Sequence, residues 1–200
     1  MSAAPVVIID GGGANIASLS FALERLGRTA VLTTDHDRIR EAGHVILPGV
    51  GAAGAAMARL AGAGLDRLIP TLTQPVLGIC LGMQLLYEAS EEDDVHCLGV
   101  IPGVARRFTP APDRPVPHMG WNRIQPLAAA DLLAGIAPGS HCYFVHSYAL
   151  PVTAATIATA SYGRAFAAVA QERNFLATQF HPERSGRTGA AILANFLNRY

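Results

Sequence analysis

The sequence predicts an α/β fold in which helices flank a mostly parallel central sheet. In the first half of the chain, short apolar runs alternate with segments of helical periodicity. Such runs are typical of parallel strands that are buried on both faces. The second half contains proline-rich pieces between strand-like segments, which predicts an additional antiparallel region.

Apolar runs in the first half predict four strands, over residues 6–9, 30–32, 44–47 and 75–79. Apolar residues at helical spacing predict helices over 15–26, 53–73 and 81–89. Gly27 follows the first of these helices and supplies a typical end signal.

The second half is expected to be rich in strands. Five prolines between positions 102 and 117 indicate loops and hairpins. Strands are expected within 141–150, 155–162 and 166–180, with a turn at 172–174, and an amphipathic helix over 189–200 closes the chain. No linker or internal repeat interrupts this order, so residues 1–200 are expected to form one domain.

Composition narrows the class of protein further. The formal net charge is zero and only 6% of residues are aromatic, which argues against nucleic-acid binding. No apolar run approaches the roughly 18 residues of a membrane span, and no signal peptide is apparent. The three cysteines lack metal-ligand spacing, so free thiols in a cytoplasmic protein are expected, with no metal and no cofactor.

Cys80 lies between two glycines, Gly78 and Gly82, where an apolar strand meets a helical segment. The pattern G-x-C-x-G has the form of a nucleophile elbow, a sharp turn that tolerates no side chains beside the nucleophile. The backbone N–H groups that follow, starting with Leu81, are free to stabilise a thiolate or an oxyanion. The alternative is an ordinary core cysteine, which is how we interpret Cys97 and Cys142.

A cysteine nucleophile needs a base and a group that orients the base. His181 ends a predicted strand, and Pro182 fixes a turn that lets Glu183 reach back to the imidazole. A strand-end histidine beside a solvated glutamate is the alternative. The combination of the elbow and His-Pro-Glu, about 100 residues apart, favours a Cys80–His181–Glu183 triad.

Three segments, PGVG (48–51), GICLGMQLL (78–86) and QFHPERSG (179–186), together resemble the class I glutamine amidotransferases. The resemblance implies a flavodoxin-like sheet and hydrolysis of L-glutamine through a Cys80 thioester. It implies that Val50 or Gly51 and Leu81 hold the oxyanion. It further implies that Gly51, Gln84, Ser147 and Tyr148 bind the glutamine.

Within this family, PHMGWN (117–122) and YFVHSY (143–148) resemble the branch that serves imidazole glycerol phosphate synthase in histidine biosynthesis. That resemblance implies a heterodimer with a (β/α)₈ cyclase, which receives ammonia through a protected channel. Asn15, Trp121, Tyr143 and Arg184 match partner-facing positions. Unlike most of the family, the chain carries glycines at positions 11–13 instead of an aromatic residue after Asp10.

Three alternatives remain open at this stage. The chain could be the amidotransferase of another pathway, although PHMGWN and YFVHSY argue against that. It could be a stand-alone peptidase or γ-glutamyl hydrolase that needs no partner. It could also be a catalytically inactive binding module, although such a module would be expected to lack one of the triad residues.

Overall fold

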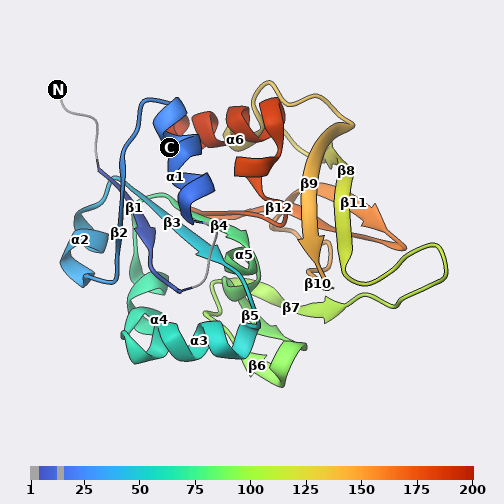
Figure 1. Cartoon of the computed structure of the whole chain (residues 1–200), viewed down its shortest axis with the longest axis horizontal. Coiled ribbons are helices and arrows are strands. Elements are labelled where there is room, and N and C mark those ends of the chain that lie inside the picture. The colour runs from blue at the N-terminus through green and yellow to red at the C-terminus, as the bar shows by residue number, and fades with distance from the viewer. Residues whose placement is uncertain (1–4, 13–15) are drawn as a thin grey trace.

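The computed structural model describes residues 5–12 and 16–200 (Figure 1). The strands are β1 (Val6–Ile9), β2 (Ala30–Thr33), β3 (His44–Gly49), β4 (Val76–Cys80), β5 (Tyr87–Ser90), β6 (Val95–His96), β7 (Ile101–Arg107), β8 (His118–Pro126), β9 (Ser140–His146), β10 (Tyr148–Ala149), β11 (Thr156–Tyr162), β12 (Arg164–Glu172) and β13 (Phe175–Thr178). The α-helices are α1 (Ile16–Arg25), α2 (His36–Glu41), α3 (Ala53–Gly62), α4 (Leu65–Leu68), α5 (Leu81–Leu85) and α6 (Gly186–Arg199). The 3-10 helices are η1 (Ile69–Thr71), η2 (Glu92–Asp94), η3 (Asp131–Leu133) and η4 (Pro182–Arg184).

The main sheet confirms the expected α/β class. Its order is β2-β1-β3-β4-β13-β12-β11-β8-β9, and β10-β7-β5-β6 form a smaller sheet. The strands from β2 to β13 pair in parallel, whereas those from β13 to β9 pair antiparallel. The antiparallel region therefore extends the parallel sheet, and the whole sheet is mixed.

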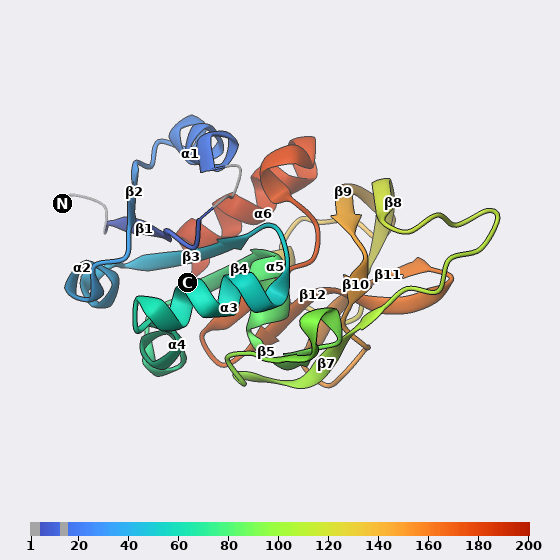
Figure 2. The same cartoon turned by 60° about the horizontal axis from the view of Figure 1, so that its bottom comes forward.

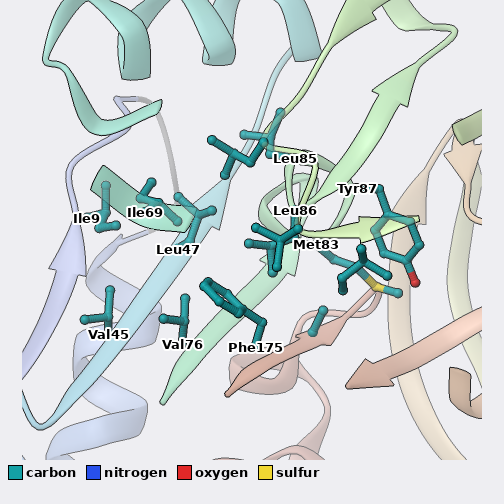
Figure 3. Close-up of a cluster of buried hydrophobic side chains, with 14 of the residues drawn as sticks. Ile9, Val45, Leu47, Ile69, Val76, Met83, Leu85, Leu86, Tyr87 and Phe175 are labelled. Carbon is teal, nitrogen blue, oxygen red and sulfur yellow. The ribbon is translucent and has the colours of Figure 1, made fainter. Parts of the chain in front are cut away.

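Helices cover both faces of the parallel half (Figures 1 and 2). Successive side chains of β1 alternate between the faces, so Val6 and Ile8 pack with α1 and α6, whereas Val7 and Ile9 pack with α3 and α4. The second of these clusters continues through Val45, Leu47 and Met83 to the aromatic ring of Phe175 (Figure 3).

The helix expected over 81–89 is wrong in its second half. Helix α5 ends at Leu85, and residues 87–90 form β5. Tyr87 and Ala89 pair with β7 and β6, so the ladder hydrogen bonds of the small sheet outweigh the local helical pattern. The region 53–73 is helical as expected, but it divides at Gly64, which adopts a left-handed conformation between α3 and α4.

The carboxyl ends of β3, β4 and β13 meet at one edge of the sheet. Gly49 pairs with Cys80 across β3 and β4, and Ile79 pairs with Thr178 across β4 and β13. This register brings the PGVG segment at 48–51, the elbow and the residues after β13, from 179 onward, side by side, although they are far apart in the chain. None of the helices described is long and apolar enough to cross a membrane.

Candidate active site

A cavity of about 260 Å³ opens at this edge of the sheet. Cys80 and His181 lie in its wall, so the structure brings together the expected nucleophile and base. The oxyanion candidates Val50, Gly51 and Leu81 line the same cavity.

Cys80 is the last residue of β4 and adopts a φ of 55° and a ψ of −110°, which is rare for a residue with a side chain. The close approach of Gly78 to Gly82 makes this turn possible, because a Cβ on Gly78 would lie 2.8 Å from the Gly82 carbonyl oxygen. Strain of this kind is concentrated at functional sites. The side chain is largely buried, so the elbow presents the sulfur to the cavity and not to open solvent.

Glu183 contacts His181 as expected. Its Oε1 lies 2.8 Å from His181 Nδ1 and both side chains are largely buried. A carboxylate oxygen only accepts, so Nδ1 carries the hydrogen and Nε2 is left for the sulfur. Burial lowers the pKa of His181, but the adjacent Cys80 and Glu183 more than offset burial and raise it to about 10. The imidazolium form is therefore favoured at neutral pH, as a proton donor to a leaving amine requires.

Gln84 lies on α5, one turn after Cys80, and lines the cavity. Its Nε2 donates to the Tyr148 carbonyl at 2.9 Å and to Gln179 Oε1 at 3.0 Å. Both amide hydrogens are thus engaged, so Gln84 offers only its Oε1 to a bound molecule. A cationic or amide N–H group is the matching partner.

Of the other three residues expected to bind glutamine, two line the cavity and one does not. Gly51 and Tyr148 line the cavity. Ser147 does not, and its carbonyl accepts from the backbone N–H of Phe108 at 2.9 Å. Gly51 adopts a φ of 86°, and no atom lies within 4 Å of the point that a Cβ would occupy there, whereas a Cβ on Gly49 would meet Gly82 N at 2.7 Å. The peptide plane between Val50 and Gly51 carries one of the expected oxyanion donors. The open space at Gly51 leaves room for this plane to rotate, whereas the packing at Gly49 does not.

Three of the four expected partner-facing residues form one cluster. The Trp121 and Tyr143 rings meet edge to face with centroids 6.0 Å apart, and the Arg184 guanidinium lies 4.6 Å above the Tyr143 ring. Trp121 is 57% exposed and Met119, two residues before it on the same face of β8, is 63% exposed, so the exposed apolar side chains here are contiguous. Asn15, the fourth residue, lies outside the described residues.

Several residues of the site were not anticipated from the sequence. Gln179 is fully buried, and its Nε2 lies 3.9 Å from the Cys80 sulfur. Glu92 lines the cavity and accepts from the Ala53 N–H at 3.0 Å, so a carboxylate from the acidic segment 91–94 caps α3. Burial raises the pKa of Glu92. Val145 also lines the cavity and was not anticipated. His146 lines it as well; the sequence indicated that either His141 or His146 could approach the site, because the two face opposite sides of one strand, and the placement of β9 beside the elbow selects His146.

The two other cysteines behave as expected for structural thiols. All three cysteines are free. Burial raises the pKa of Cys97 to about 11 and that of Cys142 to about 12, which leaves both as neutral thiols at physiological pH.

Comparison with known proteins identifies the family. Residues 7–200 match the family described as glutamine amidotransferase class-I. The chain therefore belongs to the class I glutamine amidotransferases, as its sequence motifs indicated. Within that family, it is 54% identical to "Imidazole glycerol phosphate synthase subunit HisH" of Xylella fastidiosa over 192 residues, which are 96% of each chain. The protein of the same name from Xanthomonas axonopodis is 53% identical over the same share of each chain.

Solved structures agree on the fold. A putative GMP synthase protein from Thermoplasma acidophilum superposes with a TM-score of 0.76 at 18% identity, covering 98% of this chain and 94% of that one. A glutamine amidotransferase from Thermotoga maritima gives a TM-score of 0.72 at 14% identity, covering 100% and 98%. At such low identity these similarities concern the fold alone.

Proposed function

We propose that this chain is the glutaminase subunit of imidazole glycerol phosphate synthase and that Cys80, His181 and Glu183 carry out the hydrolysis. The observation that carries the proposal is that Cys80 and His181 share one cavity wall and Glu183 contacts His181 Nδ1 at 2.8 Å, in a class I amidotransferase with HisH relatives. Residues 1–200 form one amidotransferase domain on this proposal, since a single sheet runs through both halves. Cytoplasmic localisation stays a prediction.

The proposed reaction follows from the site. The Cys80 sulfur attacks the carboxamide carbon of glutamine, while backbone N–H groups of Leu81 and of Val50 or Gly51 hold the oxyanion. The His181 imidazolium protonates the departing ammonia, and the neutral ring then activates a water molecule that hydrolyses the thioester. Gly51, Gln84, Ser147 and Tyr148 bind the glutamine on this proposal.

We propose that the ammonia leaves toward a (β/α)₈ cyclase, in a heterodimer with a protected channel. Val145 lines the cavity, and its register partner Met119 is 63% exposed beside Trp121. An apolar, exposed face thus continues from the site to the Trp121–Tyr143–Arg184 cluster. At neutral pH ammonia released to water becomes ammonium, which has lost its nucleophilic lone pair.

Ammonia release with and without the cyclase and its ligand tests this function. The isolated chain is expected to hydrolyse glutamine slowly and the complex much faster, because the Val50 peptide next to open Gly51 has room to rotate into or out of the oxyanion hole. Full activity without any cyclase would favour the stand-alone hydrolase instead.

Trp121→Ala is expected to weaken binding of the cyclase by about tenfold or more, since buried aromatic anchors of an interface contribute roughly 2 kcal/mol or more. Titration calorimetry measures the effect. Leu32→Ala is the matched control, because Leu32 is exposed on β2 at the opposite edge of the sheet. Equal affinities of the two variants for the cyclase would show that the interface does not include Trp121.

Glu183→Gln is expected to lower kcat by about a hundredfold, less than loss of the nucleophile, because the residue acts through His181. Since Glu183 raises the pKa of His181, the variant loses activity at a lower pH on the alkaline side than the wild type. A pH–rate profile of the complex measures both effects. An unshifted alkaline limb would contradict the orienting role.

A further inference from the structure

Two buried histidines outside the triad face each other across β8 and β9. His118 and His146 are paired in the register of the two strands and are only 4% and 6% exposed. His118 Nδ1 lies 3.0 Å from His146 Nε2, within hydrogen-bond distance. Aromatic rings enclose them: Tyr162 stacks on His118 with centroids 4.1 Å apart, and Phe166 lies 5.2 Å from His146. The two histidines come from PHMGWN and YFVHSY, to which the proposed chemistry assigns no buried side chain.

The hydrogen bonds around this pair have only one consistent direction. His146 Nδ1 lies 2.8 Å from the Tyr148 carbonyl oxygen, which only accepts, so Nδ1 carries the hydrogen. In the neutral ring Nε2 then accepts, and His118 Nδ1 must donate to it. Asn122 completes the chain, since its Nδ2 donates to His118 Nε2 at 3.3 Å and to the Ser161 carbonyl at 2.9 Å.

Burial keeps both rings neutral. It lowers the pKa of His118 to about 4 and that of His146 to about 3. Two smaller effects act on the pKa of His146: the hydrogen bond to the Tyr148 carbonyl raises it, and the positive charge of neighbouring His181 lowers it. Neither ring is suited to proton transfer at neutral pH, so the pair differs in role from the triad histidine.

The chain of bonds ends at the cavity. The Tyr148 carbonyl accepts from His146 and also from Gln84, whose amide continues to Gln179 and the Cys80 sulfur. The bond from His146 to Tyr148 closes the turn over residues 146–148. In the proposed function, backbone groups of this turn and the Gln84 oxygen contact the glutamine.

We propose that the His118–His146 pair is a positioning relay, which locks the 146–148 turn and the Gln84 amide so that the cavity holds the α-amino and carboxylate end of glutamine. This inference rests on the proposed function. The relay starts on β8, on the strand that carries exposed Trp121, so the partner-facing strand and the glutamine cavity share one hydrogen-bonded network. His118 lies outside the cavity wall. His146 is part of that wall, but both of its ring nitrogens are engaged by Tyr148 and His118, so the pair acts through Tyr148 and Gln84.

Steady-state kinetics of glutamine hydrolysis in the cyclase complex test the relay. His118→Phe keeps the aromatic stacking but removes the donor to His146, so KM for glutamine is expected to rise about tenfold with a smaller change in kcat, the pattern of lost uniform binding. His118→Asn places an amide N–H near the position of Nδ1 and is expected to restore KM to within about threefold of wild type. His44→Phe is the matched control, because His44 is a buried histidine bonded to the Tyr200 carbonyl, outside the network.

The tautomers supply a readout that does not depend on activity. Nitrogen-15 spectra of histidine-labelled wild-type protein are expected to show both His118 and His146 neutral at pH 7 and protonated on Nδ1. An Nε2-protonated His146, an unchanged KM in His118→Phe, or an equal loss in His118→Asn would overturn the relay. If the wild-type complex hydrolyses no glutamine, the proposed function fails, and the spectra still decide whether the relay exists. If His118→Phe does not fold, His118→Asn and the spectra decide.

Discussion

Cys80→Ala is expected to abolish ammonia release from glutamine, by at least about 10⁴-fold in the cyclase complex. Loss of a covalent nucleophile removes the thioester route, and the oxyanion donors alone provide only a small residual rate. Neither other cysteine lies in the cavity wall, so nothing described at the site replaces the Cys80 sulfur. A coupled assay of glutamate and ammonia measures the loss.

Cys142→Ala is the matched control. Cys142 is also buried, but burial raises its pKa to about 12 and it belongs to the core beneath β9. Its removal is expected to lower stability by roughly 1–2 kcal/mol and to leave the chemical step unchanged. Ammonia release that survives in Cys80→Ala, or that disappears in Cys142→Ala while the protein stays folded, would contradict the assigned nucleophile.

The parallel half of the fold was predictable because its signals are local. The runs at 6–9 and 44–47 are apolar on both faces, and the structure places them as β1 and β3. The elbow was predictable for a similar reason, since Gly78 and Gly82 record the steric demand of the turn in the sequence itself. His181 and Glu183 are two residues apart, so their contact was also a local inference.

The residues that were missed depend on contacts between distant segments. Tyr87–Ser90 continues a helical pattern, yet it forms a strand because β6 and β7 provide ladder partners. Gln179 was visible as part of QFHPERSG, but its contacts with Gln84 and Cys80 exist only once β13 lies beside β4. Sequence periodicity carries no information about that strand order.

The His118–His146 pair also depends on strand order, which the sequence pattern does not reveal. The sequence places His146 five residues from His141 on one strand, and alternation predicts that the two face opposite sides. His146 is indeed buried and His141 exposed. Which strand supplies the partner of His146 follows only from the antiparallel register of β8 and β9, in which His118 is the opposite residue.

Gly82→Ala is expected to lower the free energy of unfolding by roughly 3 kcal/mol, because the added methyl group would clash with backbone atoms that can move only if packed elements shift. A Cβ on Gly82 would lie 1.9 Å from the Leu47 carbonyl oxygen of β3. Separating α5 from β3 relieves this clash and moves Leu81 away from the Val50–Gly51 segment. Hydrolysis is therefore expected to be lost even in protein that remains folded.

Urea unfolding of the two variants Gly82→Ala and Gly62→Ala separates this steric effect from a general cost of losing glycine. Gly62 is the last residue of α3 and has no atom within 4 Å of its Cβ position. Alanine there is expected to raise stability slightly, by up to about 1 kcal/mol, since alanine favours the helix. A Gly82→Ala protein with wild-type stability and activity would mean that β3 and α5 separate freely. The elbow would then owe its shape to Gly78 and to the φ of Cys80, and not to the contact between α5 and β3.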